Sequence, residues 1–192
     1  MEEQKKPGAR VQEKEKGAHG LVIVYTGDGK GKTTAALGMA FRAIGRGWRV
    51  LMVQFGKGSW HYAELDTAKR LAPDIEIIPV GKGFYKILDD HFSEQEHRTA
   101  AQEGLAFARG TMLSGDYDLL ILDEINGTVS SGLLDVQDVL KLLDEKPEDL
   151  SLVLTGRNAA PELIERADLV TEMREIKHPY QKGILAQKGI DY

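Results

Sequence analysis

A glycine-rich segment ending in Gly31-Lys32-Thr33 has the residue types and spacing of a phosphate-binding loop. The sequence from Thr26 to Thr34 follows the pattern G-x-x-x-x-G-K-[ST], except that Thr26 stands where the pattern has its first glycine. Glycines permit left-handed backbone angles, so successive N–H groups can turn inward and surround an anion. Lys32 can reach phosphate oxygens and the Thr33 hydroxyl can bind magnesium, so we expect this loop to bind ATP. The expected ATP-binding residues of the loop are Thr26, Gly27, Asp28, Gly29, Lys30, Gly31, Lys32, Thr33 and Thr34.

A dinucleotide-binding fingerprint and an incidental glycine-rich turn both fit this segment less well. The fingerprint would need a third glycine where the sequence has Lys32, so the G-x-G-x-x-G spacing fails. A glycine-rich turn with an incidental lysine would not need a buried strand before it and a helix after it. The apolar run at 21–25 and the helical pattern at 34–44 supply both, and the helix N-terminus adds partial positive charge.

A pair of acids, Asp123-Glu124, directly follows the apolar run 119–122 and is expected at the carboxyl end of another buried strand. A phosphate-binding loop of this kind usually works with a carboxylate that holds magnesium or its water molecules. We therefore expect Thr33, Asp123 and Glu124 to form a magnesium site. In an ATPase the second acid would often activate water, and the spacing leaves open whether Glu124 does so or only binds metal.

Three weaker features lie outside this pair of motifs. Residues 54–58 and 155–157 follow predicted strands at the edge where open α/β sheets bind ligands, and Arg157 offers a guanidinium to ATP or is a plain surface arginine. Phe84 and Tyr85 follow two glycines in a loop that suits either ordinary packing or contact with a flat apolar ligand. The histidines show no metal-binding spacing, and no serine or histidine stands in a recognisable nucleophile arrangement.

The apolar pattern around these motifs predicts strands that alternate with helices. Buried strands are expected at 21–25, 50–53, 75–78, 119–122, 152–154 and 169–170. Helices are expected at 34–44, 61–71, 93–113, 136–143 and 161–167, the third opened by a capping box of Ser93 and Glu96. Alternation of this kind implies right-handed crossovers and a mostly parallel sheet. The expected fold class is a three-layer α/β fold of the P-loop NTPase type (RecA-like), with helices on both faces.

Composition fits one globular domain, which we place at residues 20–192. Residues 1–19 are rich in charge and form either a solvated tail or a charged helix that orders against a partner. A formal charge of −5 argues against nucleic acid as a general partner, and the longest apolar runs are too short to cross a membrane. The absence of cysteine excludes disulfides and thiolate chemistry and suits the reducing cytoplasm, where we expect the protein.

Taken together, these segments resemble the corrinoid adenosyltransferases of the CobA/CobO/BtuR type. The resemblance covers about residues 18–192, and its most specific parts are the threonine-led loop and the C-terminal tetrapeptide. The matching segments are Thr26–Thr34, Val53–Gly58, Gly83-Phe84, Leu122-Asp123-Glu124, Thr155-Gly156-Arg157 and Gly189–Tyr192. The resemblance implies a homodimeric enzyme that transfers the 5′-deoxyadenosyl group of ATP to the Co(I) of a corrinoid and releases triphosphate. It further implies Mg²⁺ as cofactor and a flavoprotein reductase as electron donor.

The resemblance also assigns roles to individual residues. Lys32 and Phe84 are the implied catalytic residues, with Phe84 in an apolar loop that removes the lower axial ligand of the corrinoid. The family often has a tryptophan where this chain has Lys86, so Phe84 acts either alone or with Tyr85 or Trp60. The N-terminal segment is implied to be a helix that closes over the active site. The competing functions are a P-loop ATPase or small-molecule kinase, and an ATP-dependent switch.

Overall fold

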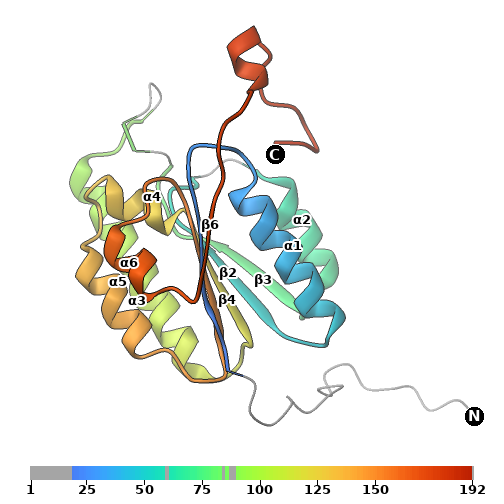
Figure 1. The fold of residues 1–192 in the computed structure, drawn as a ribbon, viewed down its shortest axis with the longest axis vertical. Helices are drawn as coiled ribbons and strands as arrows, with labels where there is room; N and C mark the ends of the chain where they lie inside the picture. The colour runs from blue at the N-terminus through green and yellow to red at the C-terminus, as the bar shows by residue number, and fades with distance from the viewer. Residues whose placement is uncertain (1–18, 59–60, 84, 87–89, 192) are drawn as a thin grey trace, which may run out of the picture.

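The computed structural model describes residues 19–191, apart from 59–60, 84 and 87–89. Within this part of the chain, six strands form one parallel sheet with the order β3-β2-β4-β5-β1-β6 (Figure 1). The strands are β1 (Val22–Thr26), β2 (Val50–Gln54), β3 (Ile75–Pro79), β4 (Leu119–Asp123), β5 (Ser151–Thr155) and β6 (Leu169–Glu172). All six predicted strands are therefore present, each with slightly different ends.

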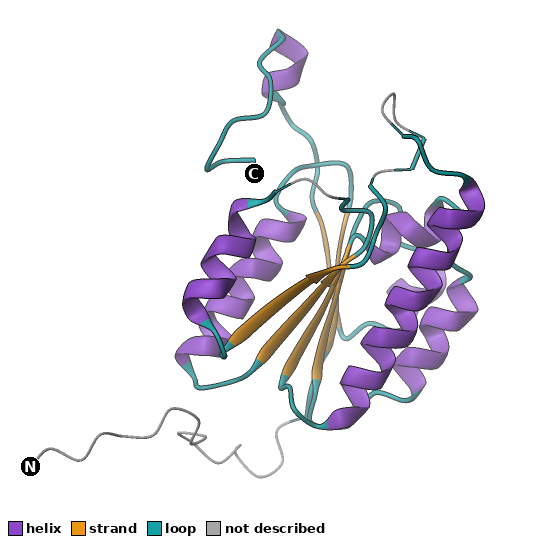
Figure 2. Cartoon of the chain, turned by 180° about the vertical axis from the view of Figure 1, so that it is seen from behind, coloured by secondary structure: helices purple, strands orange, loops and turns teal. Residues whose placement is uncertain are grey.

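Helices cover both faces of the sheet (Figure 2). On one face lie α1 (Lys32–Gly45) and α2 (Ala63–Leu71). On the other lie α3 (Glu94–Ser114), α4 (Ile125–Ser130), α5 (Val136–Asp144) and α6 (Pro161–Arg166), and a 3-10 turn, η1 (Pro179–Lys182), follows in the C-terminal segment. Among the described helices, none is long and apolar enough to cross a bilayer. The result is the three-layer arrangement that the alternating sequence pattern predicts.

Alternation of side chains along the central strands divides the core into two parts. In β1, Val22 and Val24 pack with the helices α3, α5 and α6, whereas Ile23 packs with α1 and α2. The buried positions of α1 include Ala36 and Ala40, whose small side chains allow the helix to lie close to the sheet. The short loop 27–31 joins the end of β1 to the first turn of this helix.

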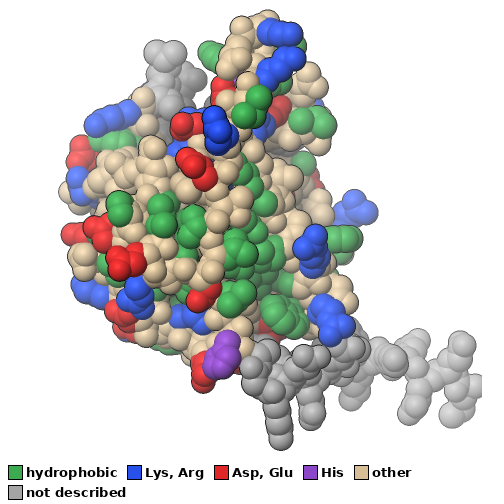
Figure 3. Space-filling model, in the orientation of Figure 1, with side chains coloured by type: hydrophobic (Ala, Val, Ile, Leu, Met, Phe, Trp, Pro, Cys, Tyr) green, Lys and Arg blue, Asp and Glu red, His purple; other side chains and the backbone are tan. Residues whose placement is uncertain are grey.

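The predicted burial of the strand at 169–170 is wrong. All four residues of β6 are exposed, and Leu169 and Val170 keep 41% and 40% of their surface. The reason is topological: β6 is an edge strand that pairs only with β1. Figure 3 shows hydrophobic side chains gathered in the middle of this face, where β6 runs in Figure 1.

The helices differ from the predictions mainly at their ends. The capping box is confirmed: Ser93 Oγ accepts a hydrogen bond from Glu96 N at 3.3 Å, and Glu96 Oε2 accepts one from Ser93 N at 2.8 Å. Ser93 is accordingly the cap and not the first helical residue. Helix α1 begins earlier than expected, at Lys32, and α2 begins later, at Ala63. The short helix α4 was not expected, because its six residues are too few to show a helical period.

Candidate functional site

The phosphate-binding loop joins β1 to α1 at the carboxyl edge of the sheet. Gly27 and Gly31 have φ angles of 94° and 110°, in the left-handed region that side chains disfavour. A Cβ atom at Gly27 would lie 2.4 Å from the carbonyl oxygen of Met173, so that position has no room for a side chain. Met173 directly follows β6, and its carbonyl oxygen also accepts a hydrogen bond from Gly29 N at 2.7 Å. The C-terminal segment therefore packs directly on the loop.

Thr26, which replaces the first glycine of the usual pattern, is the last residue of β1 and is buried. Its Oγ1 accepts a hydrogen bond from Ala159 N at 3.1 Å. This contact ties the start of the loop to the segment that follows β5. It gives a structural reason for a threonine here, because glycine would leave the Ala159 N–H without this acceptor.

Lys32 is buried, and its ammonium group lies over the loop that it follows. Its Nζ donates to Gly27 O at 2.7 Å and to Gly29 O at 2.8 Å. Burial lowers the pKa of the ammonium, and the nearby carboxylate of Glu124 opposes that shift. The two loop carbonyl oxygens thus accept the hydrogen bonds that the Lys32 ammonium group could donate to a phosphate.

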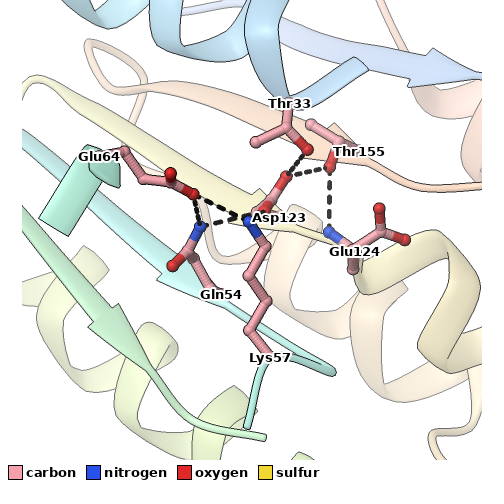
Figure 4. A network of polar contacts seen from close by, with 7 residues as sticks. All are labelled: Thr33, Gln54, Lys57, Glu64, Asp123, Glu124 and Thr155. Carbon is pink, nitrogen blue, oxygen red and sulfur yellow. Dashed lines mark hydrogen bonds and ion pairs between the residues drawn. The ribbon is translucent and has the colours of Figure 1, made fainter. Parts of the chain in front are cut away.

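Asp123, at the end of β4, is fully buried and is held through both of its oxygens (Figure 4). Oδ1 accepts hydrogen bonds from the hydroxyls of Thr33 at 2.8 Å and Thr155 at 2.7 Å. Oδ2 accepts from Gln54 Nε2 at 3.4 Å and lies 3.9 Å from Lys57 Nζ. The structure therefore brings Thr33 and Asp123 together, as the sequence predicts, and it makes Asp123 the residue that orients the Thr33 hydroxyl.

A partly buried ion pair beside Asp123 is not apparent from the sequence. Lys57 Nζ lies 2.9 Å from Glu64 Oε1 and 4.1 Å from the centre of the Tyr62 ring. Gln54 Nε2 also donates to Glu64 Oε1, at 3.2 Å (Figure 4). Burial acts to raise the pKa of Glu64, but the contacts with Lys57 and Gln54 contribute to a larger opposing effect, so the pKa is lowered. The position of Lys57 after β2 was the only available signal, since Glu64 lies at the start of α2 with no motif around it.

Glu124 has a backbone conformation that marks it as unusual. Its φ is 63°, in the left-handed region, and its N–H donates to Thr155 Oγ1 at 3.0 Å. Non-glycine residues in this region cost about 1–3 kcal/mol and tend to occur at functional sites. Burial raises the pKa of the Glu124 carboxyl, and the Asp123 carboxylate raises it further, while Lys32 acts in the opposite direction. The turn directs Glu124 away from the path of β4 and into the wall of a cavity.

The residues present fit a magnesium ion of the kind bound with phosphates. Thr33 and Glu124 offer hard oxygen donors, whereas both Asp123 oxygens are already engaged. Among the residues that the structure describes, no group of three or more His, Cys, Asp or Glu side chains could hold a metal by itself. Magnesium commonly uses one or two protein oxygens together with phosphates and water, so such a group is not required.

Arg157 lies at the rim of the loop. It is exposed, and its Nη2 donates to Asp28 O at 3.4 Å. Gly156, with φ 129°, turns the chain at the end of β5, and a Cβ atom there would lie 2.7 Å from Gly127 N. The guanidinium predicted from the sequence is therefore next to the phosphate-binding loop, from a third strand of the sheet.

A cavity of about 260 Å³ opens between the carboxyl edge of the sheet and α3, and one of its lining residues is Glu124, whose charge acts on Lys32 of the phosphate-binding loop. Its walls are largely apolar and include Phe55, Tyr85, His97 and Leu133, with Glu124 as an acidic member. Phe84 and Trp60, two of the aromatic residues that the sequence suggests for this role, lie outside the described residues. Tyr85 contributes to the wall and also packs against the core, so both alternatives for this loop stay open, and His97 was not expected there.

Comparison with known proteins shows similarity along nearly the whole chain. A family model described as ATP:corrinoid adenosyltransferase BtuR/CobO/CobP matches residues 18–192. The corrinoid adenosyltransferase of Escherichia coli (strain K12) is 35% identical over 173 residues, which are 90% of this chain and 86% of that protein. The corrinoid adenosyltransferase of a Sinorhizobium species is 41% identical over 177 residues, which are 90% of this chain and 80% of that protein.

Solved structures with low sequence identity share the fold. A KaiC-like protein from Pyrococcus horikoshii superposes with a TM-score of 0.53 at 16% identity, covering 83% of this chain and 75% of that one. The RadB recombinase superposes with a TM-score of 0.50 at 14% identity, covering 84% and 78%. These neighbours confirm the predicted three-layer, RecA-like fold class.

Proposed function

The chain belongs to the ATP:corrinoid adenosyltransferase family and is an enzyme with ATP and a corrinoid as substrates; we propose that it transfers the 5′-deoxyadenosyl group to Co(I) and releases inorganic triphosphate. In this reaction the electron pair of Co(I) forms a bond to C5′ of ATP. The C5′–O bond breaks, and its electron pair leaves with triphosphate. No general base is required, because cobalt is itself the nucleophile.

The observation that best supports this assignment is the position of Glu124 between the phosphate-binding loop and the apolar cavity. Glu124 lines the apolar cavity, and its charge acts on Lys32 of the phosphate-binding loop. A phosphate-binding loop next to a largely apolar cavity suits a reaction between ATP and a large, mostly apolar partner. An ATPase, whose second substrate is water, would need only the first of these two parts.

The loop residues are proposed to stabilise the charge that grows on triphosphate as it leaves. Lys32 would exchange its bonds to Gly27 O and Gly29 O for phosphate oxygens, and the loop N–H groups would donate to the same oxygens. Arg157 would add a second cation from the rim. The magnesium ion that Thr33 and Glu124 would hold supplies further positive charge there. Asp123 would keep the Thr33 hydroxyl in its orientation and would not contact the metal.

Residues around the cavity are proposed to bind the corrinoid and hold its cobalt near C5′. Alignment of two reactants at one site can itself supply a large part of a rate enhancement. Phe84 would displace the lower axial ligand before reduction to Co(I), and Tyr85 would help, because its ring already lies in the cavity wall. A flavoprotein reductase is the proposed electron donor, and a homodimer in the cytoplasm is the proposed form.

One reaction tests the proposed function against its alternatives. The protein is mixed with ATP, Mg²⁺ and chemically reduced cobalamin, and the phosphate product is identified by ³¹P NMR. Triphosphate formed together with adenosylated cobalamin supports the proposal. ADP or free phosphate would instead indicate a kinase or ATPase, and the absence of turnover would indicate an ATP-dependent switch.

A further inference from the structure

One wall of the apolar cavity is formed by a loop between β3 and α3, whose described residues belong to no helix or strand. The described wall residues in this loop are Gly81, Lys82, Gly83 and Tyr85. A loop without a hydrogen-bonded ladder needs other contacts to keep one shape. Three of the contacts that the structure describes there involve a single side chain of helix α3, His97.

Asp90 accepts hydrogen bonds from two backbone N–H groups of this loop. Its Oδ2 accepts a hydrogen bond from Lys86 N at 2.8 Å, and its Oδ1 accepts one from Phe92 N at 3.1 Å. Lys86 has a φ of 61°, so this carboxylate supports a left-handed turn in a residue that has a side chain. Asp90 therefore connects the point where the chain leaves the cavity wall to the point where it enters α3.

His97 connects Asp90 to the rigid part of the fold. Its imidazole is buried on α3, and Nε2 lies 2.9 Å from Asp90 Oδ1. Helix α3 is a firm base for this contact, because its first turn is closed by the capping box of Ser93 and Glu96. The hydrogen bond from His97 is also the main reason why the pKa of Asp90 is lowered to about 2.

The same imidazole supports the aromatic part of the wall. The Tyr85 ring lies 5.2 Å from the His97 ring, centre to centre, at 58°, and the Phe92 ring meets it edge-on at 6.0 Å. The Tyr85 hydroxyl donates to Glu94 Oε2 at 2.6 Å, so this side chain is anchored to α3 at both its ring and its tip. His97 and Tyr85 both line the cavity.

We propose that His97 is a positioning residue that acts through Asp90 and Tyr85 to hold this wall in the shape that accepts the corrinoid. The proposal rests on the proposed function, since it takes the cavity as the corrinoid site. A buried histidine costs more to desolvate than an apolar residue of similar size, so packing alone does not explain it. We expect ATP binding not to depend on this contact, because none of the hydrogen bonds that the structure describes for His97 and Asp90 reaches the phosphate-binding loop.

The test compares two substitutions of His97 in the full-length protein. His97→Leu removes the donor to Asp90, and His97→Gln keeps an N–H group near the place of Nε2. With pre-reduced cobalamin, we expect His97→Leu to raise the KM for cobalamin about tenfold, the size expected for one lost hydrogen bond to a charged group. The KM for ATP should change less than about twofold, because the phosphate-binding loop is untouched. His97→Gln should recover most of the cobalamin affinity. His91→Leu, an exposed histidine in the same loop, is the matched control.

A double-mutant cycle with Asp90→Ala separates a shared function from two independent losses. If His97 acts through Asp90, the double variant should bind cobalamin no more weakly than the worse single variant. Additive losses would overturn the coupling. An unchanged KM for cobalamin in His97→Leu, or equal rises in both KM values, would overturn the positioning role. If the wild-type protein itself makes no adenosylated cobalamin, the proposed function has failed and the role assigned to His97 fails with it.

Discussion

Lys30, in the middle of the phosphate-binding loop, forms an ion pair with Asp191, which lies 161 residues further along the chain. The other oxygen of Asp191 accepts a hydrogen bond from Gln187 N at 2.8 Å, which fixes the turn that carries it. Together with the bond from Gly29 N to Met173 O, this pair closes the C-terminal segment over the loop (Figure 1). Asp191 of the C-terminal tetrapeptide, which in the sequence is only a point of resemblance, therefore has a partner in the phosphate-binding loop.

Asp191→Asn is expected to tighten ATP binding by about two- to fivefold. The substitution removes a carboxylate that competes with phosphate for Lys30, and exposed ion pairs contribute up to about 1 kcal/mol. Isothermal titration at low and high salt measures the effect, which should shrink as salt increases. Glu175→Gln removes one charge from the same segment and serves as control. Weaker ATP binding in Asp191→Asn would mean that Asp191 supports the loop and does not compete with ATP.

Lys32→Ala is expected to abolish turnover and to weaken ATP binding by about 100-fold, or roughly 3 kcal/mol. The lost contacts are charge-assisted and lie in a buried part of the site. Equilibrium binding of ATP together with a turnover assay measures both effects. Lys141→Ala, on the exposed side of α5, controls for the loss of one positive charge. Wild-type activity in Lys32→Ala would remove the phosphate-binding loop from the mechanism.

Glu124→Gln is expected to raise the magnesium concentration required for half-maximal activity by about tenfold, because it removes a charged oxygen donor. The ligand-free variant should also unfold about 2–4 °C above the wild type, which corresponds to about 1 kcal/mol. The reason is that burial raises the pKa of this carboxyl, so its ionised form is costly without a cation. Glu103→Gln, exposed on α3, is the control. Unchanged metal dependence with a shifted pH–rate profile would favour a general base.

Asp90 should make the stability of the protein depend on pH in the acid range. Its pKa is lowered from 3.8 to about 2, chiefly by the hydrogen bond from His97, so the folded state favours the carboxylate. The resulting stabilisation of the folded state is fully present above the unfolded-state pKa of 3.8, and it is lost as the pH falls through the folded-state pKa of about 2. Urea unfolding should show Asp90→Asn less stable than wild type at pH 5, with the difference shrinking toward pH 2. A constant difference across this range would contradict the assignment.

The central strands were predictable because a strand that is buried on both faces has an almost continuous apolar sequence. Runs such as 119–122 are apolar at every position, and β4 is indeed buried on both faces. The edge strand β6 has the same kind of residues but only one neighbour, and neither its place at the edge of the sheet nor its exposure can be read from four residues. Helix α4 was missed for a related reason, since one and a half turns show no period.

The site was predictable where the chemistry depends on residues that are close in sequence. Their spacing in the sequence was enough to predict the segment Gly31-Lys32-Thr33 and the acids at the end of β4. The structure brings Thr33 to Asp123. The pairs Lys57–Glu64 and Lys30–Asp191 depend on how the chain returns to the sheet edge, which no local pattern encodes. The role of Phe84 stays a prediction, because that residue lies outside the described part of the chain.

The most direct test of the central claim is the fate of C5′ of ATP. ATP labelled with ¹³C at C5′ is incubated with the protein, Mg²⁺ and chemically reduced cobalamin, and the corrinoid is then examined by NMR and mass spectrometry. We expect the labelled carbon to be bound to cobalt, with one triphosphate released for each adenosylated corrinoid. Label that remains in ADP or AMP, with the corrinoid unlabelled, would contradict adenosyl transfer.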